Sequence, residues 1–301
     1  AALLMVGLLC VSLGVATGAD ATGPNGQRAL GGSANPLSNY RLPFIALGIL
    51  ALVALILVER RAKHPLIPLG LFRSRIFSAA NVSNFLIGGA LMVAMVNVPL
   101  QVALMATPGR TEVVSAELLG AFCLAMAIGG IVGGWLSNRI DYRRVVLLGL
   151  VPAAVGFLLM SQGPNHLELA QMGIELAVAG LGFGLGIAPI VAAALEAARE
   201  RDLGIASGLV IATRLFGMTI GISAMTGWAV SRLNRQLTAL PPLKQSPTES
   251  LAEYLIRQEQ YLENVALPLT LSIIRDTFAV AAVICVLAMI PALLLRRGRS
   301  D

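Results

Sequence analysis

The chain has 301 residues, of which 56% are hydrophobic and only 13% are charged. Soluble domains average about 25% charged residues, so the composition predicts an all-α protein that crosses a membrane several times. The net charge of +6 does not indicate nucleic-acid binding, because the basic residues cluster at the ends of apolar runs. The three cysteines lie inside apolar runs and there are only two histidines, so we expect neither a metal site nor a cofactor.

Eight apolar runs approach the ~20 residues that a helix needs to cross a bilayer core. In chain order they are 1–18, 40–58, 76–105, 118–134, 145–160, 167–198, 204–230 and 271–295. Alternate connecting segments differ in charge, with thirteen Lys and Arg residues in the set that includes the C-terminal tail and seven in the other set. The positive-inside rule therefore predicts a cytoplasmic C-terminus. Because Ala1 already lies inside an apolar run, we expect a fragment of a longer protein.

A short charged segment joins the fourth and fifth runs and predicts a tight turn between antiparallel helices. Its polar and glycine positions are Gly134, Asn138, Arg139, Asp141, Arg143 and Arg144. The pattern resembles the loop signature of the major facilitator superfamily, although Asn138 stands at the usual Asp and Asp141 at the usual Gly. Asp141 could replace the missing aspartate in charge pairing. We expect this loop to latch the cytoplasmic side of the helical bundle, with Arg143 and Arg144 at anionic headgroups.

Two further stretches resemble the fourteen-helix drug:proton antiporters (EmrB/QacA type) of that superfamily. The first runs from Glu59 to Phe77, and the second contains Gly204, Arg214-Leu215-Phe216-Gly217 and Gly221. The resemblance implies that residues 1–58 are the extra central helix pair with its outer loop and that 59–75 form a basic cytoplasmic linker. Residues 76–301 would then be the C-terminal six-helix half, with an outer loop at 231–270, and the N-terminal half would be missing.

Three ionisable residues inside apolar runs are functional candidates, because charge in a membrane is costly. Glu175 could exchange a proton, face a cationic substrate or be held by packing hydrogen bonds. Arg214 could be a static pin of the bundle or a charge that changes partners between transport states. Asp276 follows Arg275 near the outer end of the last run, where both side chains can reach the interface.

Small and amide side chains give the remaining candidates. Glycines expected at helix contacts are Gly130, Gly182, Gly186, Gly217 and Gly221. Because Gly182 and Gly186 lie opposite Gly180 and Gly184 on one helix, that helix should have close neighbours on both sides. Asn97 and Gln101, one turn apart, could line an aqueous cavity or make hydrogen bonds between helices.

No catalytic constellation, P-loop or dinucleotide motif occurs, so we do not expect an enzyme. The resemblance implies proton-coupled efflux of lipophilic or cationic drugs across a bacterial plasma membrane. Its partners would be the lipid bilayer, protons, a small lipophilic substrate and the missing N-terminal half.

Two alternatives to drug efflux remain open. The same fold could export an endogenous lipid or metabolite. Otherwise the chain could be a membrane scaffold or sensor that binds an outer, periplasmic partner through residues 231–264. Leu251, Tyr254, Leu255, Gln258 and Leu262 in that segment have helical spacing, which suits a membrane surface or a docking partner.

Overall fold

The computed structural model describes residues 69–106, 109–163, 168–238 and 251–295, together with a few isolated positions between 43 and 54. These ranges are helical and contain no β-strand. Six of the described helices are long and apolar enough to cross a membrane, namely α3 (Arg75–Met105), α4 (Thr111–Ser137), α5 (Tyr142–Ser161), α6 (Leu169–Glu196), α7 (Leu203–Thr238) and α9 (Leu267–Ala292), the last with a preceding extension. The all-α membrane fold is thereby confirmed, while the runs predicted at 1–18 and 40–58 lie outside the described residues.

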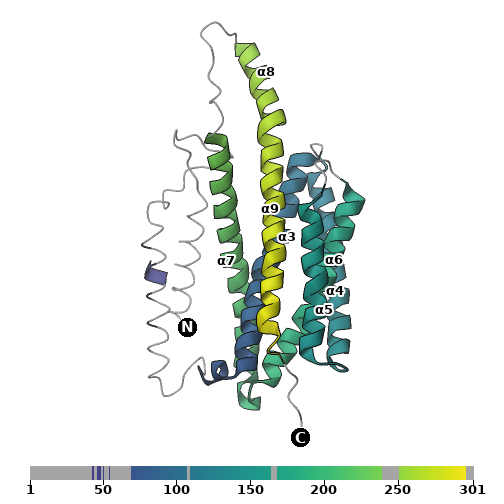
Figure 1. Ribbon diagram of the computed structural model, residues 1–301, viewed down its shortest axis with the longest axis vertical. Helices are drawn as coiled ribbons and strands as arrows, with labels where there is room; N and C mark the ends of the chain where they lie inside the picture. Colours follow the sequence, from purple (N-terminus) through teal and green to yellow (C-terminus); the bar gives the residue numbers. More distant parts are fainter. Residues whose placement is uncertain are drawn as a thin grey trace.

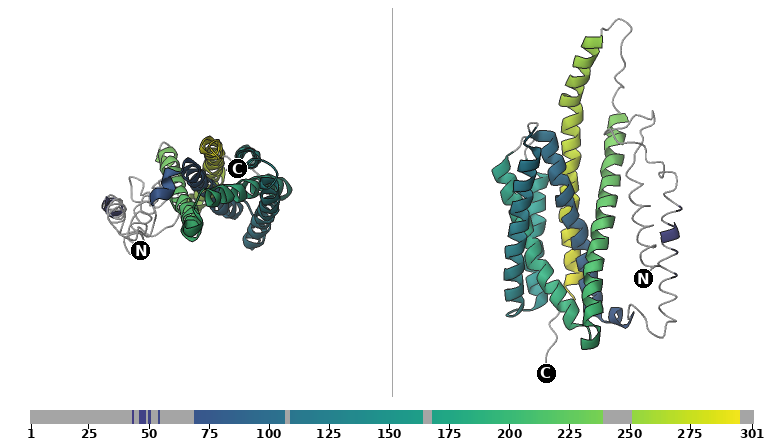
Figure 2. Two further views of the ribbon diagram at one scale, coloured as in Figure 1. Left: turned by 90° about the horizontal axis from the view of Figure 1, so that it is seen from below. Right: turned by 180° about the vertical axis from the view of Figure 1, so that it is seen from behind.

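The helices form two packed groups, which meet mainly where α9 packs against α5 and also where α3 packs against α6 (Figure 1). In one group α6 packs against both α4 and α5. In the other, α3 pairs with α7, and α9 packs against both α3 and α5. The right view in Figure 2 shows these long helices running side by side along one axis, and the left view shows the bundle from one end. The end that carries the turn between α4 and α5 is called the turn end here, and the opposite end the far end.

The glycines of α6 allow its close packing on both sides. A Cβ atom at Gly180 or Gly184 would collide with the backbone of α4, at Phe122 and Met126 respectively. A Cβ at Gly182 would collide with the backbone of α5 at Gly149 and Ala153, whereas Gly186 makes only ordinary contact with the Leu150 side chain. The prediction that this helix has close neighbours on both sides is therefore confirmed.

On α7 and α4 the glycine predictions have different outcomes. Gly217 and Gly221 lie directly against the α3 backbone, at Phe85 and Gly89. The prediction for Gly130 needs correction, because open space surrounds the position where its Cβ would lie. The Cβ side of Gly129 and Gly133 faces α6 instead, against Leu181 and Leu185, while Gly130 meets Gly184 of α6 only through its backbone nitrogen. One residue turns an α-helix by 100°, so neighbouring glycines face different surroundings.

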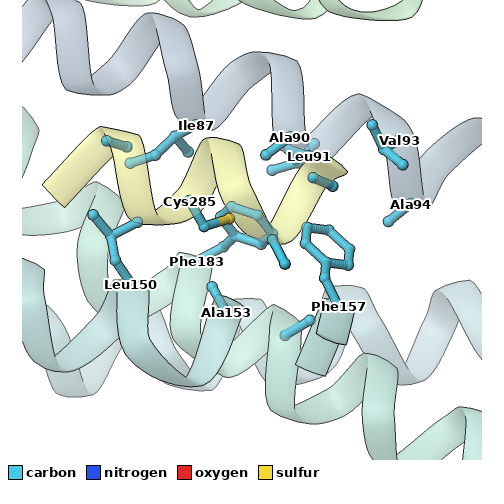
Figure 3. Close-up of a cluster of buried hydrophobic side chains, with 14 of the residues drawn as sticks. Ile87, Ala90, Leu91, Val93, Ala94, Leu150, Ala153, Phe157, Phe183 and Cys285 are labelled. Atoms are coloured by element: carbon cyan, nitrogen blue, oxygen red, sulfur yellow. The ribbon is translucent and has the colours of Figure 1, made fainter. Parts of the chain in front are cut away.

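Phenylalanines from several helices meet in the core (Figure 3). The rings of Phe157 on α5 and Phe183 on α6 lie 5.5 Å apart, edge to face, and Phe157 also reaches Phe278 on α9. Cys285 is fully buried in this cluster, as the sequence predicts, but Cys123 is exposed on α4. The apolar run that contains Cys123 did not reveal which side of the helix faces the bundle.

Two helices continue well beyond the apolar runs that predicted them. α7 extends to Thr238, and α8 (Leu251–Tyr261) leads through a π-helical turn, η5 (Leu262–Ala266), directly into α9. The predicted outer loop at 231–270 is thus helical over most of its length, in agreement with its spacing. However, α8 prolongs α9 past the bundle instead of lying flat across its end (Figure 1). Charged residues end an apolar run but not a helix, since helical backbone groups bond to each other.

Candidate transport site

The candidate residues do not meet in one place, and Glu175 lies near the far end of α6. Its side chain is only 5% exposed, and Nε2 of Gln171, one turn earlier, donates a hydrogen bond of 2.8 Å to its Oε1. Together with Glu168, these two residues line an open cleft of about 670 Å³ at the ends of α5 and α6. Within the described chain no ion pair joins a basic side chain to Glu175.

Arg214 lies on α7 in the half of the bundle nearer the turn end. The α7 backbone there lies against α3, because a Cβ at Gly88 would collide with the carbonyl of Arg214. Nδ2 of Asn84 on α3 donates a 2.7 Å hydrogen bond to the carbonyl oxygen of Val210, which lies one turn before Arg214 on α7. Nε of Arg214 is buried and has no hydrogen-bond partner among the residues described. No ion pair joins Arg214 to Glu175, so both predicted roles of Arg214 stay predictions.

Asn97 makes the interhelical hydrogen bond that was one of its two alternatives, while the aqueous cavity stays a prediction because the cavity it lines is apolar. Its Nδ2 donates a 2.8 Å hydrogen bond to Oγ1 of Thr277 on α9, and it lines a cavity of about 140 Å³ between α3, α7 and α9. This cavity is called the α3/α7/α9 groove here. Gln101, one turn further along α3, is 6% exposed and does not line the groove. Its Oε1 is buried without a hydrogen-bond partner in the described part of the chain.

Asp276 forms an ion pair that sequence reasoning did not predict. Its Oδ2 lies 2.9 Å from Nη2 of Arg232 on α7, and the guanidinium of Arg232 also lies 5.3 Å from the ring centre of Trp228. Both charged side chains are over 40% exposed. Arg275 donates from Nη1 to the carbonyl oxygen of Gly163, which ties α9 to the end of α5. The four-residue spacing of Trp228 and Arg232 could have predicted that the two side chains stack on one face of a helix. Nothing in the sequence indicated that Arg232 pairs with Asp276 on α9.

The turn between α4 and α5 has the predicted position. α4 ends at Ser137, whose Oγ donates to the carbonyl oxygen of Gly133, and α5 begins at Tyr142. The guanidinium of Arg139 lies 4.2 Å from the ring centre of Trp135, one turn earlier. The remaining predicted positions lie around the turn: Gly134 in the last turn of α4, Asn138 at its C-cap, Asp141 at the N-cap of α5, and Arg143 and Arg144 in the first turn of α5.

Six apolar spans with a few isolated polar groups between them define part of a multi-pass membrane protein. Residues 77–301 match the family model described as Major Facilitator Superfamily, and the chain belongs to that family. The superfamily predicted from the loop motif is thereby confirmed, and with it a multi-pass membrane protein.

Similar proteins include triacylglyceride transporters of mycobacteria. The one from Mycolicibacterium hassiacum is 33% identical over 98% of this chain and 55% of its own length. That from Mycolicibacterium smegmatis is 36% identical over 96% of this chain and 52% of its own length. The chain therefore spans about half the length of these curated relatives.

Solved structures support the fold. An inward-facing, unoccupied bacterial homologue of the human lysosomal transporter Spinster aligns with a TM-score of 0.61, over 90% of this chain and 63% of that chain. The two sequences are only 11% identical, so this likeness concerns the fold alone.

Proposed function

We propose that the full-length protein exports a lipid with acyl chains, and that this chain is the second half of the transporter. The observation that carries the proposal is the 33–36% identity, over nearly the whole chain, to proteins named triacylglyceride transporters. This substrate class corresponds to the lipid-export alternative given above. Proton-coupled efflux of drugs, which the antiporter resemblance implies, is the second candidate.

The polar inventory of the helices favours an uncharged cargo. Among the described residues, Glu175 is the only acidic side chain that is buried, and it already accepts a hydrogen bond from Gln171. A site for cationic drugs would need carboxylates that face the cargo, because burying an unpaired charge is costly. The other buried polar side chains are neutral, and most donate hydrogen bonds to helix backbones.

The architecture implied by the fourteen-helix antiporters is part of the proposal. Residues 1–58 would form the extra helix pair, 59–75 the cytoplasmic linker and 76–301 the C-terminal half, paired with an N-terminal half of the same protein. The protein would lie in the cell membrane with its C-terminus in the cytoplasm, which puts the far end outside. The two halves would rock about a central cavity, as in other members of this superfamily.

Transport by the full-length protein in vesicles tests the substrate class. We expect an imposed proton gradient to drive movement of a fluorescent triacylglyceride across the vesicle membrane. Movement of a cationic dye without movement of the lipid would instead support drug efflux. If neither compound moved, the scaffold or sensor alternative would gain support.

Glu175 is our candidate for proton coupling. We expect Glu175→Gln to keep the hydrogen bond from Gln171 and the fold, because the amide oxygen replaces the accepting carboxylate oxygen. Transport driven by the proton gradient should fall at least about tenfold, because a glutamine side chain cannot take up and release the coupled proton. Glu168→Gln, which alters the same cleft at an exposed position, is the matched control and should leave the rate near that of the unmodified protein. Equal effects of the two substitutions would contradict the role of Glu175.

A further inference from the structure

The α3/α7/α9 groove lies in the half of the bundle nearer the far end and is almost wholly apolar. α3 forms its floor with Met92, Val96 and Leu100, while α7 and α9 form its walls. α7 packs mainly on α3 and makes fewer contacts with α9, so a space of about 140 Å³ remains between the two. Met92 and Met225 in its lining are flexible and can adapt to the shape of an apolar chain.

Hydrogen bonding within the groove leaves only neutral donors. The hydroxyl of Thr277 donates to the carbonyl oxygen of Ile274 at 2.6 Å, and that of Thr270 donates to Ala266 at 2.8 Å. Asn97 uses one hydrogen of its Nδ2 amide for Thr277 and has a second one left. With the hydroxyl of Thr226, this amide hydrogen can donate to a neutral acceptor such as an ester carbonyl.

In the described part of the chain, the basic residue that adjoins the groove lining on α7 already has an acidic partner. Arg232 precedes the lining residue Leu233, but its guanidinium is paired with Asp276 and lies over Trp228. A phosphate group is recognised by cations that are free to pair with it. The groove therefore suits a neutral ester better than a phospholipid headgroup.

We propose that the α3/α7/α9 groove binds one acyl chain of a neutral acylglycerol, with an ester carbonyl oxygen accepting a hydrogen bond from Asn97. The proposal rests on the proposed lipid export and assigns a lipid contact to helices other than those that form the Glu175 cleft. With the far end outside the cell, the groove lies at the level of the outer leaflet. An acyl chain inserted between α7 and α9 would therefore be bound at the depth of that leaflet.

Photo-crosslinking tests the occupant directly. The full-length protein is reconstituted in phosphatidylcholine vesicles that contain either a triacylglycerol or a phosphatidylcholine with a diazirine on one acyl chain. After irradiation, mass spectrometry locates the label on peptides of α3, α7 and α9. We expect the triacylglycerol probe to label residues 92–100, 222–233 and 270–277 more strongly than the phospholipid probe does.

Two variants and one control separate binding in the groove from labelling at the protein surface. Ala229→Trp fills the groove and should abolish this labelling, whereas Ala224→Trp, on the same helix at an exposed position outside the groove, should not change it. Asn97→Leu keeps the volume but removes the donor, so labelling at low probe concentration should fall about fivefold. Asn97→Leu also keeps the test decisive if Ala229→Trp does not fold.

Two results would overturn the proposal: labelling that survives both Ala229→Trp and Asn97→Leu, or equal labelling by the phospholipid probe. Transport measured on the same vesicles separates this outcome from failure of the proposed function. If triacylglyceride moves while labelling ignores both substitutions, the groove proposal fails and lipid export stands. If labelling follows the expected pattern but no lipid moves, the export proposal fails and the binding site stands.

Discussion

Two neighbouring glycines on α4 show how much the surroundings of adjacent residues can differ in this bundle. Gly129 lies against the carbonyl oxygen of Leu181 on α6, whereas nothing lies within 4 Å of a Cβ built on Gly130. Close backbone contact through glycine is a principal source of stability where helices pack in a membrane. The two positions therefore offer a test of packing with the same substitution in the same helix.

We expect Gly129→Ala to destabilise the folded protein by about 1–3 kcal/mol, the usual cost of overpacking, because the methyl group would force α4 and α6 apart. Gly130→Ala should leave stability unchanged or raise it slightly, since alanine is the better helix former. Thermal unfolding of the purified protein in detergent, followed by tryptophan fluorescence, measures both. Equal unfolding temperatures for the two variants would contradict the packing described here.

At the scale of elements, the turn between α4 and α5 carries an exposed cation, Arg139, just after the end of α4. Arg139 lies over Trp135 one turn earlier, and both side chains are exposed. An exposed cation–π contact contributes only about 0.5–1 kcal/mol, so the turn does not need it to fold. The stacking instead holds the guanidinium beside α4, where it stays accessible to other parts of the protein.

We therefore expect Arg139→Ala to slow lipid transport in vesicles by several-fold while the unfolding temperature changes little, as a latch requires. Arg139→Lys keeps the charge but loses the planar stacking, and it separates the two contributions. Recovery of the rate by lysine would assign the effect to charge. An unchanged rate in Arg139→Ala would argue against a latch.

At the scale of the whole molecule, the six spans place the turn at 138–141 and the extension formed by α8 at opposite ends of the bundle (Figure 1). The basic residues around the turn predict that the turn end is cytoplasmic. α8 would then project from the outer surface of the membrane. A reagent that cannot cross the membrane should therefore reach α8 from outside the cell but should not reach the turn.

Single cysteines at two exposed positions test that orientation. In full-length protein whose native cysteines are replaced, Gln258→Cys should react with a membrane-impermeant maleimide on intact cells. Asn138→Cys should react only after the cells are permeabilised. Reaction of both cysteines from the same side would refute the six-span topology of the described chain.

Much of the fold was predictable because each span is encoded locally. Apolar length predicted all six described helices, and glycine spacing on α6 predicted its contacts on both sides. The limits of α4, α7 and α9 were less accurate, because apolarity marks where the membrane lies and not where a helix ends. Of the candidate site, Glu175 and Asn97 were found from their polarity alone, whereas Thr277, Trp228 and Arg232 were missed.

Composition and the loop motif alone thus determined that the chain is a polytopic membrane protein of this superfamily, since a bilayer demands long apolar helices whatever their neighbours are. Only the tertiary structure decided that a Cβ has room at Gly130 but not at Gly129, that Asp276 pairs with Arg232, and that α3, α7 and α9 enclose a groove. These facts depend on how helices distant in sequence are rotated and splayed against each other. Local periodicity does not record that rotation, because inside a membrane the lipid-facing and bundle-facing sides of a helix are both apolar.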